Sequence, residues 1–282
     1  MVAKDSFAVK VLRGKQKAKK SFSLYGISTN MMEPTPSKVP KVKLCKNCDT
    51  ALVAGDKFCS QCGQKAKTKR LTMIDIRKTV MERLLHHDQG ILLLTRDLAI
   101  RPGITIHNYF SGKRKRYYDP FKYLMLSVGL SVLATHTFGL MQGGANSHNP
   151  VSAFAEKHFN LILFVSVPFA AAWSWLLFRR KGYNFAEHLS MQAFIGGFRT
   201  VFFLLLFAPL VVLFREHYNT ILMLFVVVRL FYLLWVYLQF FGQPRWINGL
   251  KTLLLFLLLE LTMMVLIIGF FLLINPGGLR AQ

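Results

Sequence analysis

The chain has 282 residues, and its 36 Lys and Arg residues far outnumber its 13 Asp and Glu residues, giving a formal charge of +23. Residues 1–120 hold 25 of these cations and nine of the acidic residues, whereas most of the Leu, Phe and Val residues come later. A soluble protein would alternate apolar and polar faces along its whole length, so this composition argues against one and favours a polytopic membrane protein with a basic N-terminal part.

The basic excess points to a partner of opposite charge. Such an excess can serve to bind nucleic acid, to bind anionic lipid or to control membrane topology. Here the excess lies directly before an apolar segment, where each cation near an anionic leaflet contributes roughly 1 kcal/mol. We therefore expect anionic lipid headgroups as a partner. Nucleic acid is not favoured, because Phe58 is the only aromatic residue between Lys41 and Lys67.

Residues 1–40 have the composition of a flexible basic arm. Cations cluster between Lys10 and Lys20, and a proline-rich stretch follows. The arm could contact lipid or nucleic acid, or it could be a solvated tail. Translation could also start at Met31 or Met32, which would leave the preceding residues out. No apolar run with a small-residue cleavage site follows the first cations, so we expect no secretory signal peptide.

Residues 41–67 contain all four cysteines of the chain in two CxxC pairs, Cys45 with Cys48 and Cys59 with Cys62. Two such pairs separated by ten residues can present four thiolates to one tetrahedral zinc ion. A segment this short has almost no core, so metal binding would supply its folding energy. We predict a zinc ribbon whose Zn²⁺ is structural, because four protein ligands leave no open position. Disulfides and a redox CxxC are the competing interpretations.

Residues 68–120 are predicted to form a basic amphipathic juxtamembrane segment. Apolar residues recur with partial helical periodicity, and the run Ile91–Leu94 is too short to span a bilayer. We expect two or three short helices on the cytosolic face, or alternatively the packing helices of a small cytosolic domain. The adjacent His86 and His87 would point to different helix faces, which makes them poor joint metal ligands.

The segment ends in an abrupt change of composition, from Gly112 to Pro120, which we call the seam. Its cations, Arg114 and Arg116 among them, have the position of a cytosolic basic anchor. Tyr117 and Tyr118 have the position of an interfacial aromatic belt. Asp119 would then cap a helix that begins at Pro120.

From residue 121 onward the chain predicts an all-α transmembrane domain, 121–274, followed by a short tail, 275–282. Each candidate span contains about 20 mostly apolar residues, which is the number a bilayer core requires. About five spans are expected, at 121–141, 159–178, 192–214, 220–241 and 248–274. Cations alternate low and high between successive loops, which places the N-terminus in the cytosol and the C-terminus outside. The cysteines then lie in a reducing compartment, as thiolate ligands require.

Three ionisable residues, Arg199, Arg229 and Glu260, lie well inside predicted spans, where charge is costly and usually faces the bundle interior. Counting about 1.5 Å per residue places Arg229 and Glu260 both about 18 Å from the cytosolic edge. Their helices are consecutive and antiparallel, so we predict that the two pair. The charges could form a substrate or proton path, or an ion pair that fixes helix register.

Glu187 and His188 form a second polar cluster, predicted to lie in a cytosolic loop over 179–191. They could act as a base and a proton carrier. The alternative is a polar helix cap that docks on the seam. No nucleophile, phosphate-binding loop or zinc-protease motif accompanies them.

Four short stretches carry a resemblance to a known family. They are Phe58–Lys65 within the ribbon, Arg101-Pro102-Gly103, the seam, and Asn184–His188. In this order they resemble an uncharacterised bacterial family of integral membrane proteins, a domain-of-unknown-function group with an N-terminal cytosolic zinc ribbon. The resemblance implies zinc and the bacterial inner membrane. It also draws attention to Pro102, Tyr117, Pro120, Glu187 and His188, and it implies no activity.

Three functions remain open from the sequence. The leading hypothesis is a non-enzymatic adaptor or assembly factor whose ribbon and basic segment dock a cytosolic protein at the membrane. A small transporter using Arg199, Arg229 and Glu260 is the second. A membrane enzyme that acts on lipid at the cytosolic interface, with Glu187 and His188 as its chemistry, is the third.

Overall fold

A computed structural model describes residues 43–76, 90–138 and 150–274 of the chain. The predicted arm over 1–40, the pair His86 and His87, and the tail over 275–282 lie outside the described residues.

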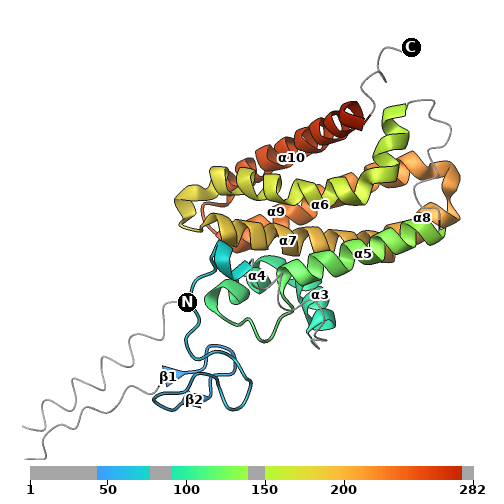
Figure 1. The fold of residues 1–282 in the computed structure, drawn as a ribbon. Coiled ribbons are helices and arrows are strands. Elements are labelled where there is room, and N and C mark those ends of the chain that lie inside the picture. The colour runs from blue at the N-terminus through green and yellow to red at the C-terminus, as the bar shows by residue number, and fades with distance from the viewer. Residues whose placement is uncertain (1–42, 77–89, 139–149, 275–282) are drawn as a thin grey trace, which may run out of the picture. The chain divides into compact units, whose positions relative to one another are not determined.

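The described residues are mostly helical, with one small two-stranded sheet (Figure 1). In chain order the elements are β1 (Lys43–Leu44), β2 (Ala51–Leu52), α3 (Ile91–Ile100), α4 (Pro102–Ser111), α5 (Pro120–Phe138), α6 (Pro150–Phe178), η2 (Arg179–Lys181), α7 (Phe185–Phe202), η3 (Phe203–Phe207), α8 (Ala208–Leu213), η4 (Arg215–His217), α9 (Tyr218–Phe241) and α10 (Arg245–Ile274).

The sheet belongs to the cysteine-rich segment. β1 pairs with β2 in antiparallel register, Lys43 opposite Leu52 and Leu44 opposite Ala51. Two residues per strand provide too few hydrogen bonds and too little apolar area for independent stability. This segment therefore needs a further source of folding energy.

Four helical stretches are long and apolar enough to cross a membrane: Leu161–Lys181, Phe185–Leu213, Arg215–Phe241 and Arg245–Ile274. They correspond to the last four predicted spans. The first predicted span, over 121–141, is described as far as Phe138 and is not among the four. Lys122 and His136 lower the apolar character of its helix, α5.

The helix of the third predicted span, α7, begins at Phe185, before the predicted start of that span at residue 192. α7 then continues into a π-helical turn, η3, before α8. Pro209 accounts for this turn, since proline has no N–H for the carbonyl of Leu205, four residues earlier, and its ring crowds that carbonyl.

The long helices α5, α6, α7, α9 and α10 lie side by side (Figure 1). α7 is in contact with both α5 and α6, whereas α10 is in contact with α6 and α9. A small residue allows the closest of these approaches. A Cβ atom on Gly197 of α7 would lie 2.6 Å from Cδ1 of the Tyr123 ring of α5, and small residues commonly occupy such helix–helix contacts.

α3 and α4 are two short helices within the predicted juxtamembrane segment, and at ten residues each they are too short to span a bilayer. Leu94, Leu98 and Ile106 are completely buried, in one core that they share with residues of α7 and α9. α4 is also in contact with α9. The two helices therefore pack against the bundle as part of its core.

Candidate metal centre and charged sites of the bundle

The four cysteines meet in space. Their Sγ atoms all lie within 4.8 Å of one another, with 3.6 Å between Cys45 and Cys62 and 3.6 Å between Cys48 and Cys59. A disulfide would need about 2.05 Å between sulfurs, so the four residues are free thiols. Four clustered cysteines could hold a metal ion such as zinc.

The two cysteine pairs have matching backbone turns. The N–H of Asp49 donates to the carbonyl of Cys45, and the N–H of Gly63 donates to that of Cys59, both at 2.9 Å. Asp49 and Gly63 both have left-handed backbones, with φ of 58° and 69°. Aspartate tolerates this region better than most residues, which explains how it fills a position suited to glycine.

Two of the four cysteine thiols differ in acidity. The hydrogen-bonding side chain of Thr50, 3.2 Å from the Cys48 sulfur, lowers the pKa of Cys48 to about 6. Burial raises the pKa of Cys62 to about 11. Cys48 is therefore more readily available as a thiolate at neutral pH than Cys62, and metal binding at Cys62 would release a proton.

The segment after the ribbon docks on the N-terminus of α7 through one buried carboxylate. Arg70 Nε donates to Glu187 Oε1 at 2.7 Å, and Arg70 Nη2 donates to Oε2 at 2.6 Å. The Glu187 side chain is 5% exposed and that of Arg70 is 54% exposed. Two parallel bonds of this kind fix orientation as well as charge. The hydrogen bond that Arg70 donates to Glu187 also raises the pKa of Arg70.

Glu187 and Asn184 form a capping box. The N–H of Glu187 donates to Asn184 Oδ1, and the N–H of Asn184 donates to Glu187 Oε2, both at 2.8 Å. Asn184 Nδ2 also donates to the carbonyl of Leu71 at 2.9 Å. The predicted loop over 179–191 is thus wrong beyond Asn184. Glu187 docks on Arg70 and Asn184 docks on Leu71, where docking on the seam was the expected alternative.

The seam contacts the ribbon linker elsewhere. The N–H of Lys115 donates to Gln64 Oε1 at 2.9 Å, and Arg114 Nη2 donates to the carbonyl of Lys69 at 2.7 Å. A groove of about 390 Å³ adjoins these contacts. Its walls include the cationic side chains of Lys46, Lys69 and Arg70 and the carboxylate of Glu187, which pairs with Arg70.

Tyr117 and Tyr118, predicted as an interfacial aromatic belt, are instead buried within the protein, at 6% and 7% exposure. The Tyr117 hydroxyl lies 3.2 Å from the buried Asp97 carboxylate, to which it donates, and this bond compensates for burial of its polar end. Arg116 lies over the Tyr117 ring, 5.8 Å from its centroid. The seam is thus a folded connection between α4 and α5.

Asp119 and Pro120 begin α5 as predicted. Asp119 Oδ1 accepts hydrogen bonds from the N–H groups of Phe121 at 3.0 Å and Lys122 at 3.4 Å. Burial raises the pKa of Asp119, and these backbone donors act in the opposite direction.

Pro102 and Gly103 begin α4 at its contact with α9. The N–H of Gly103 donates to Gln239 Oε1 at 2.7 Å. A Cβ atom on Gly103 would lie 2.6 Å from the backbone nitrogen of Phe240. Glycine is therefore required for the close approach of the two helices, whereas proline suits the first turn, where its missing N–H has no partner to lose.

His188 belongs to a buried polar network that the sequence did not reveal. Its Nδ1 lies 2.7 Å from Ser174 Oγ, which lies 2.6 Å from the Tyr237 hydroxyl. Gln192 Nε2 donates to the same hydroxyl at 2.8 Å. All four residues are buried, and they join α6, α7 and α9. In the sequence, these residues are visible only as single polar residues within apolar helices. Which of them meet depends on how the helices pack.

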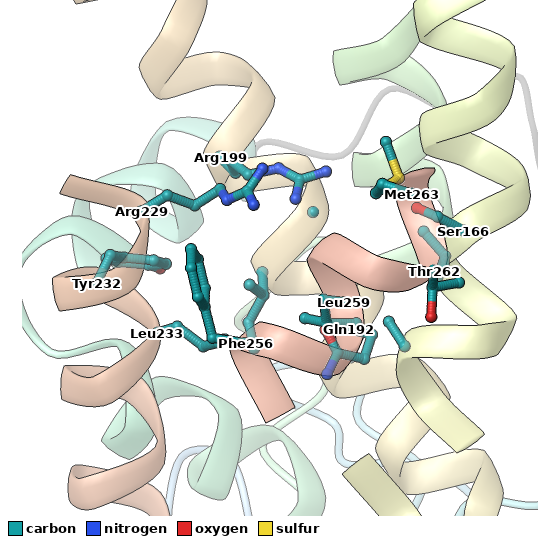
Figure 2. A pocket seen from close by; sticks show the side chains of 14 residues that line it. Ser166, Gln192, Arg199, Arg229, Tyr232, Leu233, Phe256, Leu259, Thr262 and Met263 are labelled. Atoms are coloured by element: carbon teal, nitrogen blue, oxygen red, sulfur yellow. The ribbon is translucent and has the colours of Figure 1, made fainter. Parts of the chain in front are cut away.

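Two of the three charges predicted inside the bundle, Arg199 and Arg229, line one pocket (Figure 2). Arg229 and Glu260 form an ion pair between α9 and α10. Arg199 and Arg229 both line the pocket, and Figure 2 shows their guanidinium groups beside each other. The described lining thus contains two cations, and Glu260, which pairs with Arg229, is an acidic neighbour that does not itself line the pocket.

One comparison with known proteins gives a match. Residues 88–132 match a family model described as "Protein of unknown function (DUF3667)". The matched stretch contains α3, α4, the seam and the first part of α5. No curated protein and no solved structure matches the chain.

Proposed function

We propose that this protein is a multi-pass membrane adaptor whose zinc-bound ribbon, held at one end of the helix bundle, docks a cytosolic protein. One observation carries the proposal. The ribbon is tied to the bundle through Arg70 and Glu187, yet three of its apolar side chains remain largely exposed: Leu44 at 59%, Val53 at 74% and Phe58 at 55%. Exposed apolar side chains on a positioned element are typical of protein contacts.

The metal would be zinc in a structural role. The chemistry of four clustered thiols suits Zn²⁺, and the ribbon buries only Cys45, Cys59 and Gln64 among residues 43–67. When bound, the ion would supply the folding energy that this small core lacks. Since four thiolates fill a tetrahedral site, the centre has no position for a substrate or a reactive water.

α5 would be a fifth membrane span. Leu126, Leu130 and Leu133 are each at least half exposed and recur at i, i+4 and i+7, which gives α5 an apolar outer stripe suited to lipid. Five spans, together with the cations of the loops, favour a cytosolic N-terminus and an external C-terminus in a bacterial inner membrane. The protein would then have three functional regions: the ribbon, the basic segment over 68–120 and the helices over 121–274.

The groove beside Lys46 and Lys69, the two cations of its wall that Glu187 does not pair with, would hold an anionic lipid headgroup. Its volume of about 390 Å³ is ample for a phosphate-bearing group. Cations at a membrane surface attract anionic lipid at roughly 1 kcal/mol each. This attraction would hold the ribbon close to the membrane surface.

The geometry gives less support to an enzyme based on Glu187 and His188. Both Glu187 oxygens accept hydrogen bonds from Arg70, and one also caps α7. His188 is 1% exposed and bonded to Ser174. Both residues therefore have structural partners in place of a substrate.

The adaptor proposal can be tested by quantitative affinity capture from native membranes. We expect Val53→Ser with Phe58→Ser to lose at least 90% of a cytosolic protein captured by the wild type, while zinc content and protein level stay unchanged. Leu92→Ser is the matched control, because Leu92 of α3 is an exposed apolar residue outside the ribbon, at 83%. Equal capture by the ribbon variant and the control would contradict the proposal.

A further inference from the structure

The pocket of Figure 2, which we call the arginine pocket, lies deep in the bundle between α6, α7, α9 and α10. Its polar lining consists of Ser166, Gln192, Arg199, Arg229, Tyr232 and Thr262. Arg199 is fourteen residues from the start of α7 and Arg229 is twelve residues from the end of α9. These counts place both at about 18–21 Å along their helices, near the middle of a bilayer.

The charges of the arginine pocket do not balance. Glu260 forms an ion pair with Arg229, whereas Arg199 has no acidic partner among the described side chains. One positive charge is left in excess. An uncompensated charge is costly at this depth, and a buried cation usually needs an anion and hydrogen-bond acceptors to offset its lost hydration.

Few donors in the pocket wall remain available. Ser166 and Thr262 already donate to the carbonyls of Leu163 and Leu258 in their own helices. Gln192 Nε2 donates to the Tyr237 hydroxyl. Among the described lining residues, the main free N–H donors are therefore the guanidinium group of Arg199 and those N–H groups of Arg229 that Glu260 does not engage. Guanidinium forks match the paired oxygens of carboxylate and phosphate groups.

The size of the pocket limits what it can hold. It has a volume of about 50 Å³, which is room for a few waters. A phosphate or carboxylate group fits this space, whereas a sugar or a nucleotide does not.

We propose that the arginine pocket binds a small oxyanion, a phosphate or carboxylate group that bridges Arg199 and Arg229. The negative charge of this group would balance the excess positive charge. The π-helical turn at Phe203–Phe207, one turn after Arg199, accompanies the site, and such turns occur frequently at functional sites. This inference rests on the bundle alone, so it does not depend on the ribbon or on the adaptor proposal.

The test is direct binding to the full chain in phosphatidylcholine nanodiscs. One arm titrates radiolabelled inorganic phosphate by equilibrium dialysis, and the other titrates radiolabelled oleate, so that a water-borne and a lipid-borne oxyanion are distinguished. We expect saturable binding near one per chain in at least one arm. Arg199→Gln should weaken it at least tenfold. Arg199→Lys, which keeps the charge and loses the fork, should weaken it less.

The matched control is Arg215→Gln, because Arg215 is an exposed arginine in η4, outside the pocket. The control should bind as the wild type does. If neither anion binds the wild type saturably, or if Arg199→Gln and Arg199→Lys both bind with wild-type affinity, the proposal is overturned. Retention of a single gel-filtration peak by Arg199→Lys ensures that a folding defect does not decide the outcome.

Discussion

The ribbon and the helix bundle maintain their folds by different chemistry. Within residues 43–67 only Cys45, Cys59 and Gln64 are buried. The bundle, in contrast, buries large side chains such as Phe178, Phe194 and Tyr237 completely or nearly so. The ribbon should therefore depend on bound metal and the bundle on packing, with the contacts of residues 64–71 as the coupling between them.

Removal of the metal should have the largest effect, because it should unfold the ribbon and leave the bundle folded. Cys45→Ser with Cys59→Ser removes two of the four thiolates, and structural zinc sites contribute roughly 10–16 kcal/mol of apparent binding free energy. We expect loss of zinc, measured by plasma mass spectrometry, together with rapid proteolysis confined to residues 43–67. The helices over 150–274 should stay resistant. A ribbon that resists protease without metal would contradict this dependence on zinc.

The coupling itself should be broken by Glu187→Ala. Removing one partner of a fully buried pair costs about 3–5 kcal/mol, and an exposed pair contributes about 0.2–1 kcal/mol. Because Glu187 is buried and Arg70 is half exposed, we expect a loss of about 2 kcal/mol in the free energy of unfolding, measured by denaturant titration in detergent. Glu216→Ala, at an exposed position of η4, should change it by less than about 0.5 kcal/mol.

Helix packing in the bundle can be probed by Gly103→Ala. The added methyl group would lie 2.6 Å from the backbone nitrogen of Phe240, and overpacking of this kind costs about 1–3 kcal/mol. Gly129→Ala in α5 is the matched control, since a Cβ there meets nothing within 4 Å. Alanine in an open helical site should instead stabilise by about 0.5–1 kcal/mol. Equal melting temperatures for both variants would contradict the close approach of α4 and α9.

The smallest effect is expected from Tyr117→Phe, which removes the hydrogen bond to Asp97. Loss of a hydrogen bond to a buried carboxylate should lower the free energy of unfolding by about 1–2 kcal/mol. Tyr183→Phe is the control, because Tyr183 is half-buried and its hydroxyl has no hydrogen-bond partner among the described residues. A Tyr117 variant as stable as the control would contradict a stabilising hydrogen bond between Tyr117 and Asp97.

Features that depend on neighbouring residues could be predicted from the sequence. The spacing of the four cysteines was enough to predict that they meet, and the length of the apolar runs was enough to find the four long helices. The cap at Asp119 and the start of α5 at Pro120 also follow from local rules. Arg229 and Glu260 were matched by depth, which works because consecutive membrane helices are antiparallel.

Contacts between distant segments could not be predicted in this way. Arg70 and Glu187 are separated by 117 residues, and nothing in their spacing indicates that they meet. The Asn184–Glu187 capping box was a readable signal that would have moved the start of α7 to Phe185. The hydroxyl of the buried Tyr117 is bonded to Asp97 of α3, twenty residues earlier in the chain. In each case tertiary packing decides what the local pattern leaves open.

Hydrogen exchange by mass spectrometry over residues 64–72 tests the central claim most directly. Wild type and Glu187→Gln would be compared in nanodiscs at equal zinc content. If the ribbon docks on the bundle through Arg70 and Glu187, exchange over 64–72 should rise at least tenfold in the variant while α3 and α9 keep their protection. Unchanged exchange over 64–72 with intact zinc would contradict the docking of the ribbon on the bundle.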